Sequence, residues 1–209
     1  MKYTFSLLFL IIFNVVNWAQ PISFPEKWLF KTGDDSSYKE FSFNDADWQK
    51  IKILSPWEEE GYTDYNGFAW YRLHFEVDKQ YLDKELYLLL GKIDDIDETY
   101  LNGILVGKSG TLPPNTSSDW NTQRIYKISG GILKEKNVLA VRVYDFFMEG
   151  GIYQGAVGIF DKEGYEKELT LGPAPKKSFF QLVTSNGLIA AIYNEKQNKI
   201  EKILPHIFQ

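Results

Sequence analysis

The sequence has no cysteine among its 209 residues, which excludes disulfide bonds, thiolate nucleophiles and zinc sites built on cysteine. It has only two histidines, His74 and His206, so a Ser-His-Asp arrangement would need one of them placed by chance. Phosphate-binding loops, dinucleotide fingerprints, H-E-x-x-H helices and G-x-S-x-G elbows are also absent. The sequence therefore predicts a module that is not itself catalytic, and we predict no catalytic residue and no metal ligand.

Dense runs of lysine and arginine are missing as well. The formal net charge is -5 and the sequence pI is near 5.2, so neither nucleic acid nor an anionic membrane surface is an expected partner. Aromatic residues make up 16% of the chain, which is typical of a globular protein with one sizeable core. A neutral ligand fits this charge balance better than a charged polymer.

Residues 1–19 have the pattern of a signal peptide: a basic residue, an apolar stretch, and a small residue at Ala19 where cleavage would fall. The alternative is an N-terminal anchor helix, but Asn14 and Asn17 interrupt the apolar run and no stop-transfer charges follow. We therefore expect a secreted or periplasmic protein that does not contact the membrane after cleavage.

The middle of the chain is patterned for β-strands. Residues 69–77 and 137–145 alternate between apolar and polar side chains, so each strand should turn one face to a core. Asn102-Gly103 is the dipeptide that a type I′ hairpin turn favours, because both central residues need a positive φ. Long helical periodicity is missing, and the pattern predicts an all-β jelly-roll or immunoglobulin-like sandwich.

The composition changes near the C-terminal end. We predict a jelly-roll domain over residues 20–165, a linker over 166–178 that is rich in proline, glycine and lysine, and a second β-rich domain that starts at 179–209. In that last segment the sequence predicts strands joined at Asn186-Gly187 and around 194–198. Such a short meander does not bury its apolar face alone, so we expect the natural chain to continue beyond residue 209.

The stretch 91–110 crowds acidic residues just ahead of the Asn-Gly turn. It resembles a calcium loop only superficially, since Tyr100 stands where that loop needs glycine. Acids so close together need hydrogen-bond donors, a cation or a hydroxyl-rich ligand. They could border solvent, form Asx turns, bind a sugar, or pair with an arginine. The acids in question are Asp94, Asp95 and Asp97, and the candidate arginines are Arg72, Arg124 and Arg142.

A second candidate group lies in residues 55–72, where aromatic rings alternate with acids and glycines in a loop that leads into a strand. Flat rings suit the C–H face of a sugar, while carboxylates and guanidinium groups suit its hydroxyls. The alternative is that the rings close one end of the sandwich. We assign Tyr71 to the core, whereas Trp70 and Arg72 share the other face of their strand.

The segments "WYRLHFEV", "LLLGKIDDIDETYLNGILVGKSG", "RIYKI", "NVLAVRVYD" and "GGIYQG", in that order, resemble the sugar-binding jelly-roll domain of glycoside hydrolase family 2, found in β-galactosidase and β-glucuronidase-like enzymes. A similar module occurs in sialate O-acetylesterases. The resemblance covers roughly residues 28–160 and implies a galactose-binding-like sandwich that supports a catalytic domain of the same parent chain. It also implies that Arg72 and Arg142 serve structure. The family's catalytic glutamates lie in a TIM barrel, for which this chain is too short.

The leading hypothesis is a secreted carbohydrate-binding module of a glycan-degrading enzyme. The alternatives are a glycoside hydrolase or sialate O-acetylesterase-type enzyme, with acids such as Glu58, Glu59 or Asp94 in a catalytic role, and a structural or adhesion sandwich. The expected ligand is a galactoside- or glucuronide-like glycan. No cofactor is predicted, and the sequence leaves open whether a structural calcium ion sits in the sandwich. The predicted sugar-binding residues are Trp57, Glu58, Tyr62, Tyr65, Trp70, Arg72, Asp94, Asp95, Asp97 and Arg124.

Overall fold

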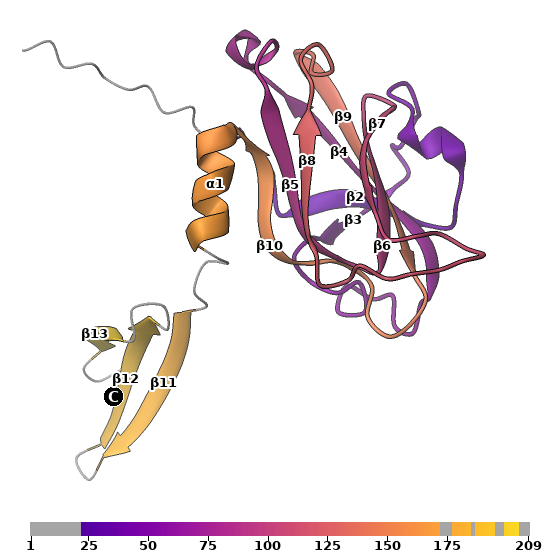
Figure 1. The fold of residues 1–209 in the computed structure, drawn as a ribbon. Coiled ribbons are helices and arrows are strands. Elements are labelled where there is room, and N and C mark those ends of the chain that lie inside the picture. Colours follow the sequence, from indigo (N-terminus) through magenta and orange to yellow (C-terminus); the bar gives the residue numbers. More distant parts are fainter. Residues whose placement is uncertain (1–21, 172–176, 185–186, 195–198, 205–209) are drawn as a thin grey trace, which may run out of the picture.

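The computed structural model describes residues 22–171, 177–184, 187–194 and 199–204. Residues 22–160 form two antiparallel β-sheets packed face to face, which confirms the predicted β-sandwich (Figure 1). The expected signal peptide at 1–19 lies outside the described residues. In the part of the chain that the structure describes, no helix is long and apolar enough to cross a membrane.

The two sheets differ in size. The larger sheet has six strands in the order β3 (Gln49–Lys52), β2 (Lys27–Thr32), β4 (Gly67–Glu76), β9 (Lys136–Asp145), β6 (Ile96–Leu101) and β7 (Ile104–Ser109). The smaller sheet has four strands in the order β1 (Ile22–Ser23), β10 (Gly151–Phe160), β5 (Leu86–Asp94) and β8 (Gln123–Ile128).

The main core lies between these sheets and is built by the alternation of the strands. In β4, Ala69, Tyr71 and Leu73 turn inward and are buried, as the pattern predicted. Tyr71 is fully buried and meets Phe30 at a ring-centroid distance of 4.9 Å. Burying a large apolar side chain of this kind stabilises the fold by about 1.5–3 kcal/mol. β4 lies between β2 and β9 and is thus a central strand that contributes to the main core.

The outer face of the six-stranded sheet carries a second, smaller apolar cluster. Trp70 and Ala140 stand on this face and are covered by the segment 33–48, which contains the 3₁₀-helix η1 (Ser36–Lys39) and Trp48. Tyr38 of η1 packs edge-on against Trp70, with ring centroids 5.9 Å apart. The covering segment therefore brings polar residues of 33–48 next to the outward side chains of β4, β6 and β9.

The predicted hairpin turn is present between β6 and β7. Asn102 and Gly103 both have positive φ values, 54° and 82°, which is the conformation that the dipeptide was expected to supply. The Asn102 side chain also donates to the Ile132 carbonyl at 2.9 Å and accepts from the Val138 amide at 2.9 Å. The turn is thus tied to the strand next to it.

Beyond the sandwich, the helix α1 (Lys162–Leu171) overlaps the start of the predicted linker. Its sequence is rich in helix-forming lysine and glutamate, and the Asp161 side chain accepts a hydrogen bond from the Gly164 amide at 2.7 Å, which caps the first turn. Tyr165 packs against Tyr87 of β5 at 4.2 Å. The strands β11 (Lys177–Thr184), β12 (Gly187–Asn194) and β13 (Lys199–Leu204) form a separate antiparallel sheet.

The predicted turns of that last segment fall largely outside the described residues. Asn186 and residues 195–198 are not described, so the expected β-turns there stay predictions.

Candidate functional site

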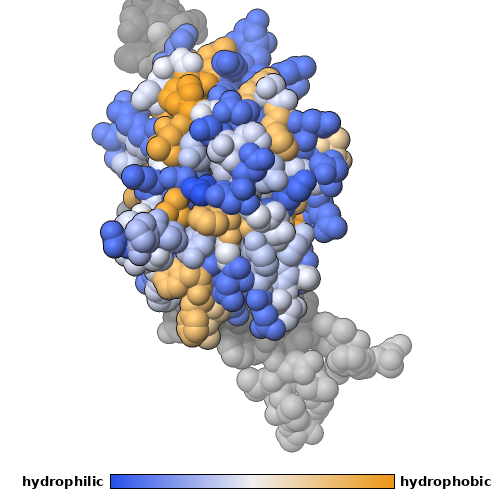
Figure 2. Space-filling model, turned by 90° about the vertical axis from the view of Figure 1, so that its right-hand side faces the viewer, coloured by the Kyte–Doolittle hydropathy of each residue, from blue (hydrophilic) through white to orange (hydrophobic). Residues whose placement is uncertain are grey.

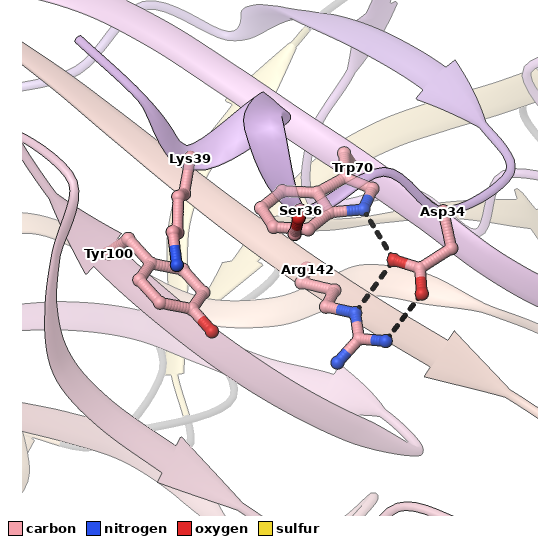
Figure 3. A pocket seen from close by; sticks show the side chains of 6 residues that line it. All are labelled: Asp34, Ser36, Lys39, Trp70, Tyr100 and Arg142. Atoms are coloured by element: carbon pink, nitrogen blue, oxygen red, sulfur yellow. Dashed lines mark hydrogen bonds and ion pairs between the residues drawn. The ribbon is translucent and has the colours of Figure 1, made fainter.

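A pocket opens on the outer face of the six-stranded sheet. Its cavity volume is about 110 Å³, and its walls come from the covering segment and from β4, β6 and β9 (Figure 3). We call it the outer pocket; it is lined by Asp34, Ser36, Lys39, Trp70, Tyr100 and Arg142. Of the residues predicted from sequence to bind sugar, Trp70 is the one that lines this pocket.

Strand register explains why these side chains meet. Arg142 of β9 lies directly across from Trp70 of β4 on one side and from Glu98 of β6 on the other, so three outward side chains stand in a row. Tyr100 follows Glu98 by two residues and therefore stands on the same face. The row is fixed by antiparallel pairing and needs no special loop geometry.

An ion-pair network fills one side of the pocket. Arg142 donates hydrogen bonds to both carboxylate oxygens of Asp34, from Nε to Oδ1 at 2.8 Å and from Nη2 to Oδ2 at 2.5 Å. Its Nη1 donates to Glu98 at 2.9 Å. Partial burial would raise the pKa of Asp34, but the hydrogen bonds from Arg142 and Trp70 outweigh it and lower that pKa below its ordinary value. Asp34 is therefore a carboxylate at neutral pH.

Tyr100 and Lys39 form the opposite side. The Tyr100 ring lies nearly parallel to Trp70, with an interplanar angle of 23° and a centroid distance of 5.9 Å. The Tyr100 hydroxyl donates to Glu98 at 3.0 Å, and burial together with that carboxylate raises its pKa to about 12. The Lys39 ammonium lies over the Tyr100 ring at 5.5 Å from its centroid.

The side of the molecule that carries η1 is mostly hydrophilic. Figure 2 shows hydrophobic side chains there in separate small groups and no continuous apolar patch.

The predicted aromatic loop faces the interior. In place of the expected surface position, Trp57 is fully buried, 5.7 Å from Phe30 and 5.8 Å from Tyr65 in ring centroids. Tyr62 packs on Phe30 at 4.8 Å. The physical reason is a space left by glycine: a Cβ on Gly150 would lie 2.0 Å from the Trp57 ring. These rings close one end of the sandwich, which is the alternative that the sequence also allowed.

Arg72 likewise has internal partners, as the family resemblance implied. Its side chain is fully buried on the outer face of β4, and its Nε donates to Asp45 at 2.7 Å. It also donates to the carbonyl oxygens of Tyr38 and Glu40, so it holds the covering segment on the sheet. His74 shares the Asp45 carboxylate at 2.7 Å. Arg72 therefore has a structural contact network in place of an exposed face.

Asp97 and Arg124 are buried together. The Asp97 carboxylate accepts from Arg124 Nε at 2.8 Å, and both side chains have no exposed surface. Tyr126 and Thr99 donate to the same carboxylate, and the other Arg124 donors reach the carbonyls of residues 95, 119 and 122. The pair thus has its hydrogen-bond partners inside the protein. Asp97, one of the acids crowded in the stretch 91–110, therefore pairs with an arginine.

The other two acids predicted in the stretch 91–110, Asp94 and Asp95, lie at the end of the sandwich beside Glu58 and Asp145. We call Glu58, Asp94, Asp95 and Asp145 the carboxyl cluster. Burial raises the pKa of Asp94 to about 8, with further contributions from a hydrogen bond to Asp95 and from its charge. Burial likewise raises the pKa of Asp145 to about 7, against the hydrogen bond from the Phe147 amide. One oxygen of Asp145 and one of Glu58 are buried without a hydrogen-bond partner in the structure.

The carboxyl cluster holds the loop between β9 and β10. Asp95 accepts from the amide of Phe146 at 3.3 Å, Asp145 from Phe147 at 2.9 Å and Glu58 from Gly150 at 3.2 Å; these three amides belong to one loop. Within the described ranges, no three acidic or histidine side chains are arranged to hold a metal ion. The hydrogen bonds of the carboxyl cluster therefore fix a backbone segment.

Sequence reasoning missed most of the outer pocket. Its signal was nevertheless present, since Arg142 is an outward residue of an alternating strand and pairing that strand with 69–77 sets it beside Trp70. The segment 33–39 carried no signal of its own, because nothing in its sequence says which face it covers.

The chain resembles known proteins in sequence. Residues 34–146 match the family model described as the beta-galactosidase second all-beta domain. A beta-galactosidase of Thermoanaerobacter pseudethanolicus is 27% identical over 99 residues, which are 44% of this chain and 13% of that protein. A beta-glucuronidase of Formosa agariphila is 24% identical over 102 residues, which are 43% of this chain and 10% of that protein. The matched region thus spans a small part of these relatives.

Solved structures agree with the family match. The crystal structure of a Bacteroides uniformis beta-glucuronidase aligns with a TM-score of 0.53 and 26% identity over 67% of this chain and 17% of its own. A glycosyl hydrolase family 2 member from Bacteroides cellulosilyticus aligns with a TM-score of 0.51 and 22% identity over 64% of this chain and 19% of its own, which shows a shared fold.

Proposed function

The chain belongs to the family of the beta-galactosidase second all-beta domain and is an all-β domain of the glycoside hydrolase family 2 type; from this premise we propose that it is the glycan-binding accessory module of a secreted glycan-degrading enzyme. In this proposal the catalytic residues lie in another domain of the same parent chain. The small share of the relatives that the match covers, 13% and 10%, supports this division of labour.

The observation that carries the proposal is the outer pocket. It combines the half-buried ring of Tyr100, which lies beside the almost fully buried Trp70, with the carboxylate of Asp34 and the donors of Arg142 around one opening. Sugars present an apolar C–H face beside vicinal hydroxyls, and proteins bind them with this mixture of rings, carboxylates and guanidinium groups. A water occupies about 30 Å³ in the liquid, so 110 Å³ corresponds to about four waters and suits part of one sugar unit.

We assign no catalytic step to the carboxyl cluster. A glycosidase needs two carboxyl groups that flank a substrate bond across a cleft. In this protein Asp95, Asp145 and Glu58 each accept from a backbone amide of the loop at 146–150, so one oxygen of each acid is engaged with the protein itself. The outer pocket is therefore the better candidate for contact with glycan.

The test is a calorimetric titration of the protein with short β-galactosides and β-glucuronides. We expect binding that weakens at least tenfold in Arg142→Met, because this change removes the guanidinium at the pocket and frees Asp34 and Glu98 from their partner. The matched control is Lys127→Met, which breaks a surface pair with Glu85 at 2.6 Å on the four-stranded sheet. Absence of binding to every glycan by the folded wild-type protein would overturn the proposal.

A further inference from the structure

The hydrogen bonds of Arg142 hold its guanidinium group by the edge. Nε and Nη2 donate to Asp34, and Nη1 donates to Glu98, as Figure 3 shows for the pair with Asp34. A guanidinium group is planar, and its N–H bonds point outward in that plane. Hydrogen bonds of this kind engage the edge of the group and not its two flat faces.

The ring of Phe68 lies against one of these faces. The Cζ atom of Arg142 lies over the Phe68 ring at 4.3 Å from its centroid, whereas the Lys39 ammonium lies 5.5 Å from the centroid of Tyr100. A guanidinium group stacks on an aromatic face and is attracted by the negative charge density there. Phe68 thus contacts Arg142 from a direction that neither carboxylate uses.

Strand register sets Phe68 at this place. Phe68 precedes Trp70 by two residues in β4 and therefore stands on the same outer face. Trp70 lies directly across from Arg142 of β9, so Phe68 is the diagonal neighbour of that arginine, within reach of a long side chain. Phe68 is not among the residues that line the outer pocket. It reaches the pocket through Arg142.

The Phe68 ring is itself packed against other rings. Tyr144 lies directly across from it on β9, with ring centroids 4.5 Å apart and an interplanar angle of 44°. Phe146 lies nearly parallel to Tyr144, at an angle of 27° and a centroid distance of 6.3 Å. Phe68 therefore belongs to a row of packed rings, and its face is a fixed support for the guanidinium group.

We propose that Phe68 is a positioning residue of the outer pocket, whose ring holds the Arg142 guanidinium in the orientation that lets it bind both carboxylate oxygens of Asp34 at once. Two parallel hydrogen bonds of this kind need the guanidinium and the carboxylate in one plane, so a tilt of either group weakens the pair. A glycan that binds beside Arg142 then meets a side chain that is already ordered. The inference concerns how Arg142 is held whether or not a glycan binds, and only its effect on affinity rests on the proposed function.

The main experiment follows the titration of Asp34 by carbon-13 NMR of its carboxyl group, with Asp34→Asn used to assign the signal. The wild-type protein is compared with Phe68→Leu, which removes the ring, and with Phe68→Tyr, which keeps it. Tyr165→Leu is the matched control, because Tyr165 is also half-buried and packs on one other ring, Tyr87 of the four-stranded sheet, at 4.2 Å. Circular dichroism checks the fold, and Phe68→Met replaces Phe68→Leu if the latter does not fold.

The expected result follows from what sets the charge of Asp34. Partial burial would raise the pKa of Asp34, and the hydrogen bonds from Arg142 and Trp70 outweigh this effect. If the Phe68 ring orients Arg142, its removal weakens those bonds. We therefore expect the pKa of Asp34 to rise toward its ordinary value in Phe68→Leu and to stay at its wild-type value in Phe68→Tyr and Tyr165→Leu.

A second experiment measures affinity in the same proteins by calorimetric titration with methyl β-galactoside. Loss of a partly exposed contact between a guanidinium group and a ring corresponds to about a threefold loss of affinity if the contact orders Arg142 for the ligand. We expect this loss in Phe68→Leu, and we expect Phe68→Tyr and Tyr165→Leu to bind like the wild-type protein.

The two experiments separate the inference from the proposed function. An unchanged Asp34 pKa in folded Phe68→Leu overturns the inference, and so does an equal rise in Phe68→Tyr or Tyr165→Leu, because the ring would then have no specific role. Failure of the wild-type protein to bind any glycan overturns the proposed function. In that case a rise of the Asp34 pKa in Phe68→Leu alone still confirms that Phe68 positions Arg142.

Discussion

Two groups of acids in this protein have opposite surroundings. On the outer face, Asp34 and Glu98 face the guanidinium of Arg142, and the pKa of Asp34 is lowered. At the end of the sandwich, Asp94 and Asp145 face other carboxyl groups, and burial raises their pKa values to about 8 and about 7. Residue type alone therefore does not set the charge of an acid; the side chains that the fold places beside it do.

The difference in pKa between the two groups of acids follows from the partners to which each group is hydrogen-bonded. The outer acids connect side chains across β4, β6 and β9, where the strand register supplies an arginine. The acids at the end hold backbone amides of one loop, and an amide neutralises no charge. Because burial and neighbouring carboxyl groups raise the pKa values of Asp94 and Asp145, we expect the stability of this end of the sandwich to depend on pH.

The largest expected effect comes from turning a paired acid into an unpaired one. Arg124→Met would leave the Asp97 carboxylate buried without its cation, and breaking a buried ion pair in this way costs about 3–5 kcal/mol. Urea denaturation followed by tryptophan fluorescence measures the free energy of unfolding. The exposed pair Lys127–Glu85 is the comparison, where Lys127→Met should have little effect on the free energy of unfolding because solvent screens the pair. A loss at Arg124 as small as that at Lys127 would show that Asp97 does not depend on its buried cation.

A second change tests the position of the loop that the carboxyl cluster holds. Gly150→Ala would set a Cβ 2.0 Å from the Trp57 ring, so the ring or the loop must move, at a cost of about 1–3 kcal/mol. Gly130→Ala is the control, because the nearest atom to its Cβ would be 3.8 Å away. Thermal melts of both variants measure the difference, and similar melting temperatures would refute the tight contact between loop and ring.

A third change removes the acid at the end of the sandwich whose pKa is most strongly raised, and with it the expected dependence of stability on pH. Between about pH 4 and 8 the folded protein keeps a proton on Asp94 that the unfolded chain has released, because the pKa is near 3.8 unfolded and about 8 folded. The free energy of unfolding should therefore fall as pH rises through this range. Asp94→Asn should flatten the profile and stabilise the protein by about 1–2 kcal/mol at pH 8, a figure reduced for the partial exposure of the side chain.

Urea denaturation at intervals from pH 4 to 8 follows that profile. Glu76→Gln, in the last residue of β4, is a control whose side chain has no hydrogen bond or ion pair among the described residues. A wild-type stability that rises steadily to pH 8 would rule out the proton-sharing arrangement.

The smallest effect is expected for the exposed acid of the outer pocket, and its sign is opposite. Asp34 has a lowered pKa, so it contributes stability above its unfolded pKa and loses that contribution as pH falls. Asp34→Asn should cost less than about 1 kcal/mol at pH 7 and still less at pH 3. Melting temperatures at the two pH values measure this. A stabilised Asp34→Asn at pH 7 would show that the pair with Arg142 is not favourable.

The sequence indicated the sandwich because alternation is a local signal. Tyr71 and Leu73 could be assigned to the core from their own strand, and Asn102-Gly103 to a turn from the dipeptide alone. The partners of the acids could not be assigned in this way. Asp94 and Asp97 are neighbours in the same acidic run, yet Asp97 meets Arg124 of β8 only because the two sheets pack together.

The outer pocket could not be predicted from the sequence for the same reason, because its residues meet only through contacts between distant segments. Arg142 and Asp34 are separated by 108 positions, and their contact depends on the segment 33–48 folding back over the sheet. Trp70 was predicted to bind sugar from its face on the strand, and it does line the pocket, although its ring is almost fully buried. Pairwise register between predicted strands is the information that would have brought Trp70, Glu98 and Arg142 together.

The alternation of β4 and β9 also has a consequence for how such a domain can change over time. Trp70 and Tyr71 are adjacent in sequence, but one lines the outer pocket and the other lies in the main core. Substitutions at outward positions such as Arg142 therefore change the outer pocket and leave the main core between the sheets unchanged. Insertion of one residue within β9 would exchange the two faces and lose both. Change in the outer surface by substitution is thus open to this domain in a way that strand insertions are not.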